Sequence, residues 1–234
     1  MQIEQALCIA LAFHYICIKQ ELMKKYKAYL FDFDYTLADS SRGIVMCFRH
    51  VLDLHRHDGI SDEEIKRTIG KTLEESFSIL TGITDPATLA SYKKEYVAKA
   101  DTCMTANTRL FPETADVLHA LKKRDAMIGI ISTKFRYRIM DLMDKHFPAG
   151  FLDIVVGGED VKASKPSPEG LLYAISKLGC NSKETLYIGD STVDALTAEA
   201  AGTDFFGVTH GATSPEELAR YPHIRIAPDL TPLI

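Results

Sequence analysis

Short apolar runs that end abruptly in polar residues recur along the second half of this chain, and segments with helical spacing of apolar residues separate them. Each run has the length of a strand, and the absence of polar alternation is typical of a strand buried on both faces. Strands that alternate with helices predict right-handed crossovers and a parallel sheet. The expected strands span residues 126–131, 154–156, 185–188 and 204–208, and the expected helices span residues 112–123, 139–147, 168–178 and 193–201.

A further strand is expected at Tyr29–Phe31, and it runs directly into Asp32 and Asp34. Ligands of parallel sheets bind beyond the carboxyl ends of the strands. Strand alternation would direct both carboxylates into one small volume, where like charges repel and raise each other's pKa. A hard divalent cation such as Mg²⁺ would compensate for this repulsion. The alternative interpretation is a strand that leads into an acidic turn, because Asp readily caps helices and begins turns.

Residues 39–108 have a different character, because apolar residues recur there at helical spacing without strand-like alternation. Ser61 and Glu64 have the spacing of a capping box, which predicts the beginning of a helix. Further helices are expected to begin at Thr72 and at Pro86, since proline favours the first turn of a helix. These residues are therefore predicted to form an all-helical cap inserted into the α/β core.

The predicted fold class is α/β, with a Rossmann-like parallel sheet core flanked by helices, formed by residues 23–38 and 109–234. Residues 1–22 are predicted to be an N-terminal helical extension, to which no chemistry is assigned. Its apolar stretch, Ala6–Ile18, is shorter than the ~18 residues that indicate a membrane span. No basic residue precedes the stretch and no small-residue cleavage site follows it, so a secretory signal is not expected either.

Composition excludes several classes of function. The chain is 46% hydrophobic and 25% charged, which is typical of a globular protein. Its net charge of -5 gives no basic excess to neutralise phosphates, so a nucleic-acid partner is not expected. The five cysteines are odd in number and include no C-x-x-C pair, which argues against a zinc site and a disulfide framework. Reduced thiols and a cytoplasmic location are expected, with no membrane partner.

Distinctive polar groups also follow the later strands. Ser132 and Thr133 could hold a phosphate or carboxylate with hydroxyl and backbone N–H groups. Lys165 lies in a proline-rigidified loop and could neutralise a carboxylate and a substrate oxyanion. Asp190 and Asp194 stand one helical turn apart after the strand at 185–188. Taken singly, these residues also fit a helix cap, a solvated lysine and acids at a helix start. Together, so many carboxylates at strand ends favour a bound metal.

The ordered set of motifs resembles the four motifs of the haloacid dehalogenase superfamily, most closely its phosphoglycolate-phosphatase-like members with a helical cap after the first motif. The matching segments are Phe31-Asp-Phe-Asp-Tyr-Thr-Leu37, Ser132, Lys165-Pro166 and Gly189-Asp-Ser-Thr-Val-Asp194. The resemblance extends from about Met23 to the end of the chain. Residues 1–22 are not explained by it.

The resemblance implies a role for each core residue. Asp32 would attack phosphorus in line and carry an aspartyl-phosphate. Asp34 would protonate the leaving alcohol and then deprotonate the attacking water. Ser132 and the Thr133 amide would hold the phosphoryl oxygens, and Lys165 would join the nucleophile to the phosphoryl group.

The resemblance also implies a Mg²⁺ site made by Asp32, the backbone carbonyl of Asp34, Asp190 and Asp194, the last either directly or through a metal-bound water. One departure from the family pattern stands beside the nucleophile. Tyr35 occupies a position where the family usually has glycine. We expect this change to alter the turn and the access to the site without abolishing catalysis.

The expected activity is Mg²⁺-dependent hydrolysis of a small phosphate monoester, of the phosphoglycolate or sugar phosphate type, through an aspartyl-phosphate. Asp34 argues against dehalogenation, and residues 40–46 contain neither the histidine of sugar-phosphate mutases nor the lysine of phosphonate-cleaving relatives. Alternatives are a pyrophosphatase, a nucleoside monophosphate phosphatase, or a catalytically silent partner-binding module. Arg42, Arg67 and Lys71 are candidate cap contacts of an anionic substrate. The expected partner is a small phosphorylated metabolite, and the expected state is a monomer or homodimer.

Overall fold

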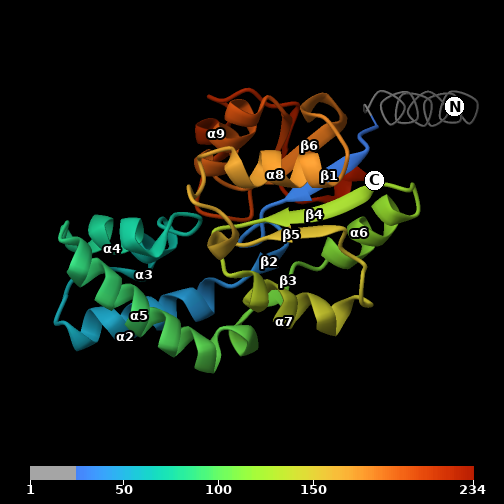
Figure 1. The fold of residues 1–234 in the computed structure, drawn as a ribbon. Coiled ribbons are helices and arrows are strands. Elements are labelled where there is room, and N and C mark those ends of the chain that lie inside the picture. Colours follow the sequence, from blue (N-terminus) through green and yellow to red (C-terminus); the bar gives the residue numbers. More distant parts are fainter. Residues whose placement is uncertain (1–24) are drawn as a thin grey trace, which may run out of the picture.

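A computed structural model describes residues 25–234 of the chain, and the predicted extension at residues 1–22 lies outside the described residues. A six-stranded sheet forms the centre of the fold, in the order β5-β4-β1-β6-β7-β8, and every neighbouring pair is parallel. Figure 1 labels β5, β4, β1 and β6 of this sheet. The predicted parallel sheet is confirmed, and β8 is a strand that the sequence pattern did not predict. The strands are β1 (Ala28–Phe31), β4 (Met127–Ile131), β5 (Ile154–Val156), β6 (Thr185–Gly189), β7 (Asp204–Val208) and β8 (Arg225–Ala227).

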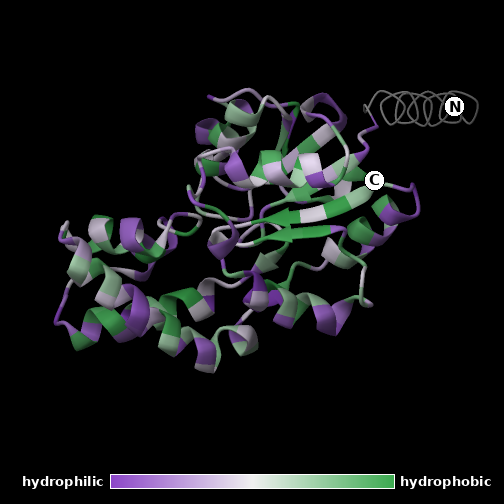
Figure 2. Cartoon of the chain, viewed as in Figure 1, coloured by the Kyte–Doolittle hydropathy of each residue, from purple (hydrophilic) through white to green (hydrophobic). Residues whose placement is uncertain are grey.

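Helices cover both faces of this sheet. Helices α6 (Thr114–Lys122) and α7 (Arg136–His146) pack their apolar residues on one face. The opposite face is covered by α8 (Glu169–Lys177), α9 (Thr192–Ala201) and the short α10 (Pro215–Leu218). The strands between them are predominantly hydrophobic, as Figure 2 shows. Single 3₁₀ turns span Thr105–Asn107, Gly158–Asp160, Ser182–Glu184 and Thr231–Leu233.

Helix α7 begins earlier than predicted. The sequence pattern indicated a beginning at Ile139, whereas the helix begins at Arg136. Its first turn contains Arg136, Tyr137 and Arg138, which show no apolar periodicity. The other predicted helices of the core differ from the structure by one or two residues at their ends, which is the ordinary uncertainty of helix boundaries. Among residues 25–234, no helix combines the length and apolar character needed to cross a membrane.

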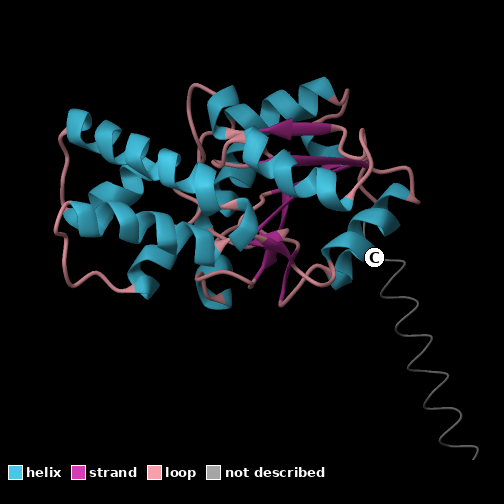
Figure 3. Ribbon diagram, turned by 90° about the horizontal axis from the view of Figure 1, so that it is seen from below, coloured by secondary structure: helices cyan, strands magenta, loops and turns pink. Residues whose placement is uncertain are grey.

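A separate helical lobe projects from one end of the sheet, and Figure 3 shows it beside the strands. Its apolar core contains a cluster of aromatic rings from three helices, with neighbouring centroids 4.7–6.3 Å apart. The lobe therefore has a core of its own, apart from the two clusters that flank the sheet. Its helices are α2 (Ser41–Leu54), α3 (Asp62–Lys66), α4 (Leu73–Thr81) and α5 (Pro86–Cys103).

Side-chain caps fix where the lobe helices begin. The Ser61 hydroxyl accepts from the Glu64 amide, and the Glu64 carboxylate accepts from the Ser61 amide, so the predicted capping box is confirmed. The Thr72 hydroxyl caps α4 as predicted. Pro86 occupies the first turn of α5, behind the Asp85 cap. Each cap satisfies a backbone donor that the first helical turn leaves free.

Two short strands connect the lobe to the sheet. Strand β2 (Ala38–Asp39) leaves the core, and β3 (Arg109–Leu110) returns to it. The two strands are antiparallel partners, with Ala38 opposite Leu110 and Asp39 opposite Arg109. The chain therefore enters and leaves the lobe at a single place.

Substitution of Phe77 tests whether the helical lobe has an apolar core of its own. Its side chain is fully buried, and its ring lies 4.7 Å from that of Phe48 and 5.4 Å from that of Tyr92. We expect Phe77→Ala to lower the free energy of unfolding by about 3–5 kcal/mol, because it leaves a cavity among these rings. Ile79→Ala, on the exposed side of the same helix, should change it by less than about 0.5 kcal/mol. Urea denaturation measures both; equal losses would contradict the assignment of this core.

Candidate active site

Strand β1 lies in the middle of the sheet, and the strand order reverses beside it. From β1 the chain continues to β4 and β5 on one side and then crosses to β6 on the other. A crevice forms beyond the carboxyl ends of the strands at such a reversal. Phe31 pairs with Ile130 and with Ile188, and the Asp32 amide donates to the Ile188 carbonyl at 2.8 Å. The residues that follow these three strands therefore lie side by side.

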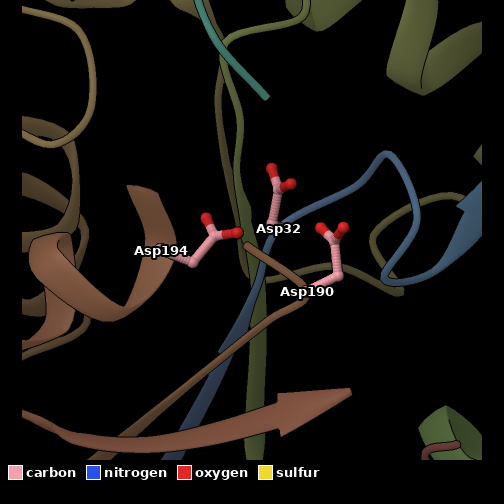
Figure 4. A group of neighbouring side chains, drawn as sticks. All are labelled: Asp32, Asp190 and Asp194. Carbon is pink, nitrogen blue, oxygen red and sulfur yellow. The ribbon is translucent and has the colours of Figure 1, made fainter. Parts of the chain in front are cut away.

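Three of the predicted carboxylates form one buried group. Asp32, Asp190 and Asp194 each offer an oxygen that lies within 4.8 Å of the other two, and Figure 4 shows their side chains around one small volume. Burial, followed by the neighbouring acids, raises the pKa of Asp190 well above its ordinary value. Burial also raises the pKa of Asp32 to about 6, against the opposing effect of Lys165. Both groups therefore lack sufficient positive charge around them.

Lys165 is the cation within this group. Its ammonium lies 2.8 Å from Asp32 Oδ1 and 2.6 Å from Asp194 Oδ1, and its side chain is 5% exposed. Although burial alone would lower the pKa of Lys165, Asp194 and Asp32 hold it well above its ordinary value. The Lys165 ammonium lies within ion-pair distance of Asp32, but the angles of this contact are not those of a hydrogen bond. Among the described residues, Asp32 Oδ1 consequently has no hydrogen-bond partner.

The carboxylate of Asp194 is held at both oxygens. Oδ1 accepts from Lys165 and lies 3.1 Å from the Tyr187 hydroxyl, while Oδ2 accepts from the Ser191 hydroxyl at 2.6 Å. A Cβ at Gly189 would lie 2.4 Å from Asp194 Cβ, so this side chain can approach the end of β6 only because Gly189 has none. Asp194 is therefore fixed in place as a partner of Lys165.

Asp34 lies outside the group of three carboxylates. Strand β1 ends at Phe31, so strand alternation does not position Asp34, which forms an isolated bridge with Ala38. Its Oδ1 lies 3.1 Å from the ammonium of Lys134 and also accepts from the Ser40 hydroxyl. The prediction that strand alternation directs Asp32 and Asp34 alike is therefore wrong. Any bond from Asp34 to a cation in the group would use its backbone carbonyl.

Tyr35 turns the chain between these two acids and the lobe. It has a φ of +58°, in the left-handed region where glycine is the least strained residue. Its amide donates to the Ala38 carbonyl at 2.8 Å, which closes the turn. The side chain is buried, and burial raises the pKa of Tyr35 to about 12. A Cβ at Gly211 would lie 3.1 Å from Tyr35 and 2.0 Å from Asp190 Oδ2, so both side chains pack against this glycine.

Ser132 and Thr133 follow β4, and both line a small cavity together with Lys165. Ser132 is 6% exposed, and its hydroxyl accepts from the Lys134 amide at 3.3 Å. The Thr133 hydroxyl donates to the carbonyl of Gly70 at 3.3 Å. Gly70 belongs to the loop between α3 and α4, so this bond joins the lobe to the sheet at the site.

A pocket of about 540 Å³, its open mouth included, lies between the lobe and the sheet. Asp34, Lys134 and Arg138 line it from the core, and Phe48, Tyr96 and Lys71 are among the residues that line it from the lobe. Of the three predicted lobe cations, only Lys71 reaches this pocket. Arg67 lines a second cavity beside Tyr35 and Asp190. Arg42 lies exposed on α2.

Three residues of the site were not predicted. Lys134 directly follows Ser132 and Thr133, and this position beyond the end of β4 could have indicated that it belongs to the site. Tyr187 puts a hydroxyl in an otherwise apolar strand, where a polar group needs a partner. Arg138 gave no signal, because a single arginine near a helix start is ordinarily solvated.

Substitution of Asp190 tests whether the group of three buried carboxylates lacks a balancing positive charge. In chelator at about pH 8, we expect Asp190→Asn to raise the free energy of unfolding, because burial and the neighbouring acids penalise the charged carboxylate of the wild type. Since folding raises this pKa, the wild-type carboxyl destabilises the fold above its folded pKa and becomes protonated as the pH falls. The advantage of the variant should therefore shrink as the pH falls. Chemical denaturation measures the difference, with the exposed Asp53→Asn as control; a pH-independent gain would contradict the assignment.

Comparisons with known proteins agree with this geometry. Residues 29–208 match the family model of the haloacid dehalogenase-like hydrolases. A pyrophosphatase PpaX from Bacillus velezensis is 30% identical over 85% of this chain and 90% of its own. A phosphoglycolate phosphatase from Yersinia pseudotuberculosis is 30% identical over 84% of this chain and 88% of its own.

A solved structure of a protein from this family is also similar to this chain. The crystal structure of a haloacid dehalogenase-like hydrolase from Bacteroides fragilis is 60% identical, with a TM-score of 0.88, and covers 90% of this chain and all of that one. The similarity extends through the sheet, the helical lobe and the site between them. The chain belongs to the haloacid dehalogenase-like hydrolases.

Proposed function

We propose that this protein is a Mg²⁺-dependent phosphatase that hydrolyses a small phosphate monoester through an aspartyl-phosphate. The buried group of Asp32, Asp190 and Asp194, with Lys165 bound to two of its members, is the observation that carries the proposal. Relatives named phosphoglycolate phosphatase and pyrophosphatase support phosphorus chemistry. The predicted cap at residues 39–108 would then close over the site and exclude water.

The acidic group fits a magnesium ion. Mg²⁺ prefers hard oxygen ligands, and the group offers carboxylate oxygens within one small volume. Burial raises the pKa of Asp190 well above its ordinary value, and it raises that of Asp32 to about 6 even with Lys165 beside it, so the group can accept further positive charge. Asp32, Asp190, Asp194 and the Asp34 carbonyl would hold the ion. When bound, Mg²⁺ would neutralise charge on the phosphoryl oxygens.

The first step transfers the phosphoryl group to the protein. An Asp32 oxygen attacks phosphorus in line, and the bond between phosphorus and the ester oxygen breaks. Asp34, protonated at this stage, gives its proton to the departing oxygen, so the alcohol leaves neutral at that atom. Asp34 then takes a proton from water, whose oxygen attacks the phosphorus. The bond to Asp32 breaks, inorganic phosphate leaves and both aspartates return to their initial state.

The remaining core residues position the phosphoryl group. Lys165, already bound to Asp32, would contact a phosphoryl oxygen and offset the charge that develops there. Ser132 and the Thr133 amide would hold the other oxygens. Tyr187 and Asp194 keep the ammonium of Lys165 in place, at 3.1 Å and 2.6 Å. These bonds fix the ammonium beside the nucleophile.

Pyrophosphate is a second candidate substrate. The chain shares 30% identity over most of its length with a pyrophosphatase, and Lys71, Lys134 and Arg138 line the pocket beside Asp34. Inorganic phosphate would then be the leaving group in the same first step. A panel of phosphorylated metabolites that includes pyrophosphate and nucleoside monophosphates separates these possibilities by their kcat/KM values.

Asp32 is the direct test of the mechanism. With p-nitrophenyl phosphate and Mg²⁺, we expect Asp32→Asn to reduce kcat by at least about 1,000-fold, because an amide cannot form the acyl phosphate. EDTA should abolish turnover by the wild type, and added Mg²⁺ should restore it. Asp53→Asn, an exposed change on α2, should retain full activity. Wild-type turnover by Asp32→Asn would refute the assignment of the nucleophile.

Lys165 links activity to stability. We expect Lys165→Met to reduce kcat by about 100- to 1,000-fold, as loss of a preorganised charge does elsewhere. In chelator it should also lower the free energy of unfolding by about 3–5 kcal/mol, because Asp32 and Asp194 lose their buried counter-charge. Mg²⁺ should restore part of that stability and none of the activity. Thermal melts with and without Mg²⁺ decide this; unchanged stability in chelator would show that the ion pairs contribute little.

A further inference from the structure

Two basic side chains of the core line the pocket beside Asp34, and the mechanism above uses neither. Lys134 comes directly after Ser132 and Thr133, and Arg138 lies in the first turn of α7. Their side chains are only 7% and 6% exposed. Burial of a cation is costly unless it is paired. Lys134 pairs with Asp34 inside the pocket. Arg138 pairs instead with Asp101, whose side chain is half exposed.

Lys134 contacts the proposed proton donor directly. Its ammonium lies 3.1 Å from Asp34 Oδ1, and both side chains line the pocket. In the proposed reaction the leaving group lies at this place, because Asp34 gives its proton to the bridging oxygen. An anionic group on the leaving group would therefore lie within reach of the ammonium of Lys134.

Arg138 lines the same pocket and has an unused donor. One terminal nitrogen donates to Asp101 at 2.7 Å and to the Val97 carbonyl at 2.9 Å, both on α5. The rings of Phe135 and Tyr137 lie 5.7 Å and 5.3 Å from the guanidinium carbon. Its Nε is buried and has no hydrogen-bond partner among the described residues. A buried donor without a partner is uncommon in native proteins, so the guanidinium has hydrogen-bonding capacity that its contacts on α5 do not use.

We propose that Lys134 and Arg138 form a subsite for an anionic leaving group, a carboxylate or a second phosphate, and so determine which phosphate compounds are hydrolysed. This inference rests on the proposed phosphatase function. It places the recognition of charge on the core, beside the proton donor, rather than on the helical lobe. Lys71 is the cation that the lobe contributes to the pocket, and it also pairs with Glu75 at 3.2 Å.

A matched pair of substrates tests the subsite. 2-Phosphoglycolate carries a carboxylate where 2-hydroxyethyl phosphate carries a neutral hydroxymethyl group, and the two compounds are otherwise alike. Pyrophosphate tests whether a phosphate is accepted as the leaving group. We expect the wild type to prefer the anionic compounds. Lys134→Met and Arg138→Met should each lower the ratio of kcat/KM for 2-phosphoglycolate to kcat/KM for 2-hydroxyethyl phosphate by about 10- to 100-fold. Arg138→Lys should keep part of the preference. Arg136→Met, an exposed change on the same turn, should leave the ratio unchanged.

A structural role of Arg138 is tested separately. Its bond to Asp101 fastens α7 to α5, so a loss of activity in Arg138→Met could arise from a displaced lobe. Asp101→Asn weakens that fastening without changing the subsite, and we expect it to keep the substrate ratio. Equal loss of the ratio in both variants would overturn the role of Arg138. A wild type without preference, or an unchanged ratio in Lys134→Met and Arg138→Met, would overturn the subsite.

Calorimetry separates this inference from the proposed function. Binding of the same matched pair is measured to Asp32→Asn in Mg²⁺, with and without Lys134→Met, so no turnover is required. Tighter binding of 2-phosphoglycolate than of 2-hydroxyethyl phosphate, lost in the double variant, supports the subsite. If that preference exists while no ester is hydrolysed by the wild type, the phosphatase proposal fails and the subsite stands. If esters are hydrolysed without any preference in binding or rate, the subsite fails alone.

Discussion

The ion pairs of Lys165 with Asp32 and Asp194 are the interaction on which the site depends. All three side chains are at least nine-tenths buried, so each charge is tolerable only because the others are present. The chain brings them together from the end of β1, the loop before α8 and the first turn of α9. A parallel sheet makes this possible, because its strands all end at one edge. Asp190 remains as the acid whose charge Lys165 does not balance, and it marks where further positive charge is required.

Much of the fold could be predicted because it depends on local patterns. The buried strands have continuous apolar runs, and the lobe helices have caps whose hydrogen bonds involve residues three apart. The predicted core residues also follow from position, since Asp32, Ser132 and Asp190 come directly after β1, β4 and β6. Strand β8 was missed because Arg225–Ala227 is short and lies at the edge of the sheet, where no long apolar run is required.

The contacts within the site could not be predicted to the same extent. The pairing of Lys134 with Asp34 joins two loops, and no sequence period relates them. Strand alternation failed for Asp34, because the strand had already ended at Phe31 and the turn at Tyr35 redirects the chain. Arg138 depends on the packing of α7 against α5, which only the tertiary structure reveals. Sequence patterns thus located the strand ends, while the direction of each side chain depended on packing.

The antiparallel pair of β2 and β3 has a consequence for how such a protein can evolve. Ala38 opposite Leu110 and Asp39 opposite Arg109 bring the two ends of a long insertion together at one point. A segment with adjacent ends can be exchanged for another of different length or shape while the strands behind it keep their register. The helical lobe and the residues at the strand ends can therefore diverge at different rates within one lineage, because the chain encodes them in separable pieces.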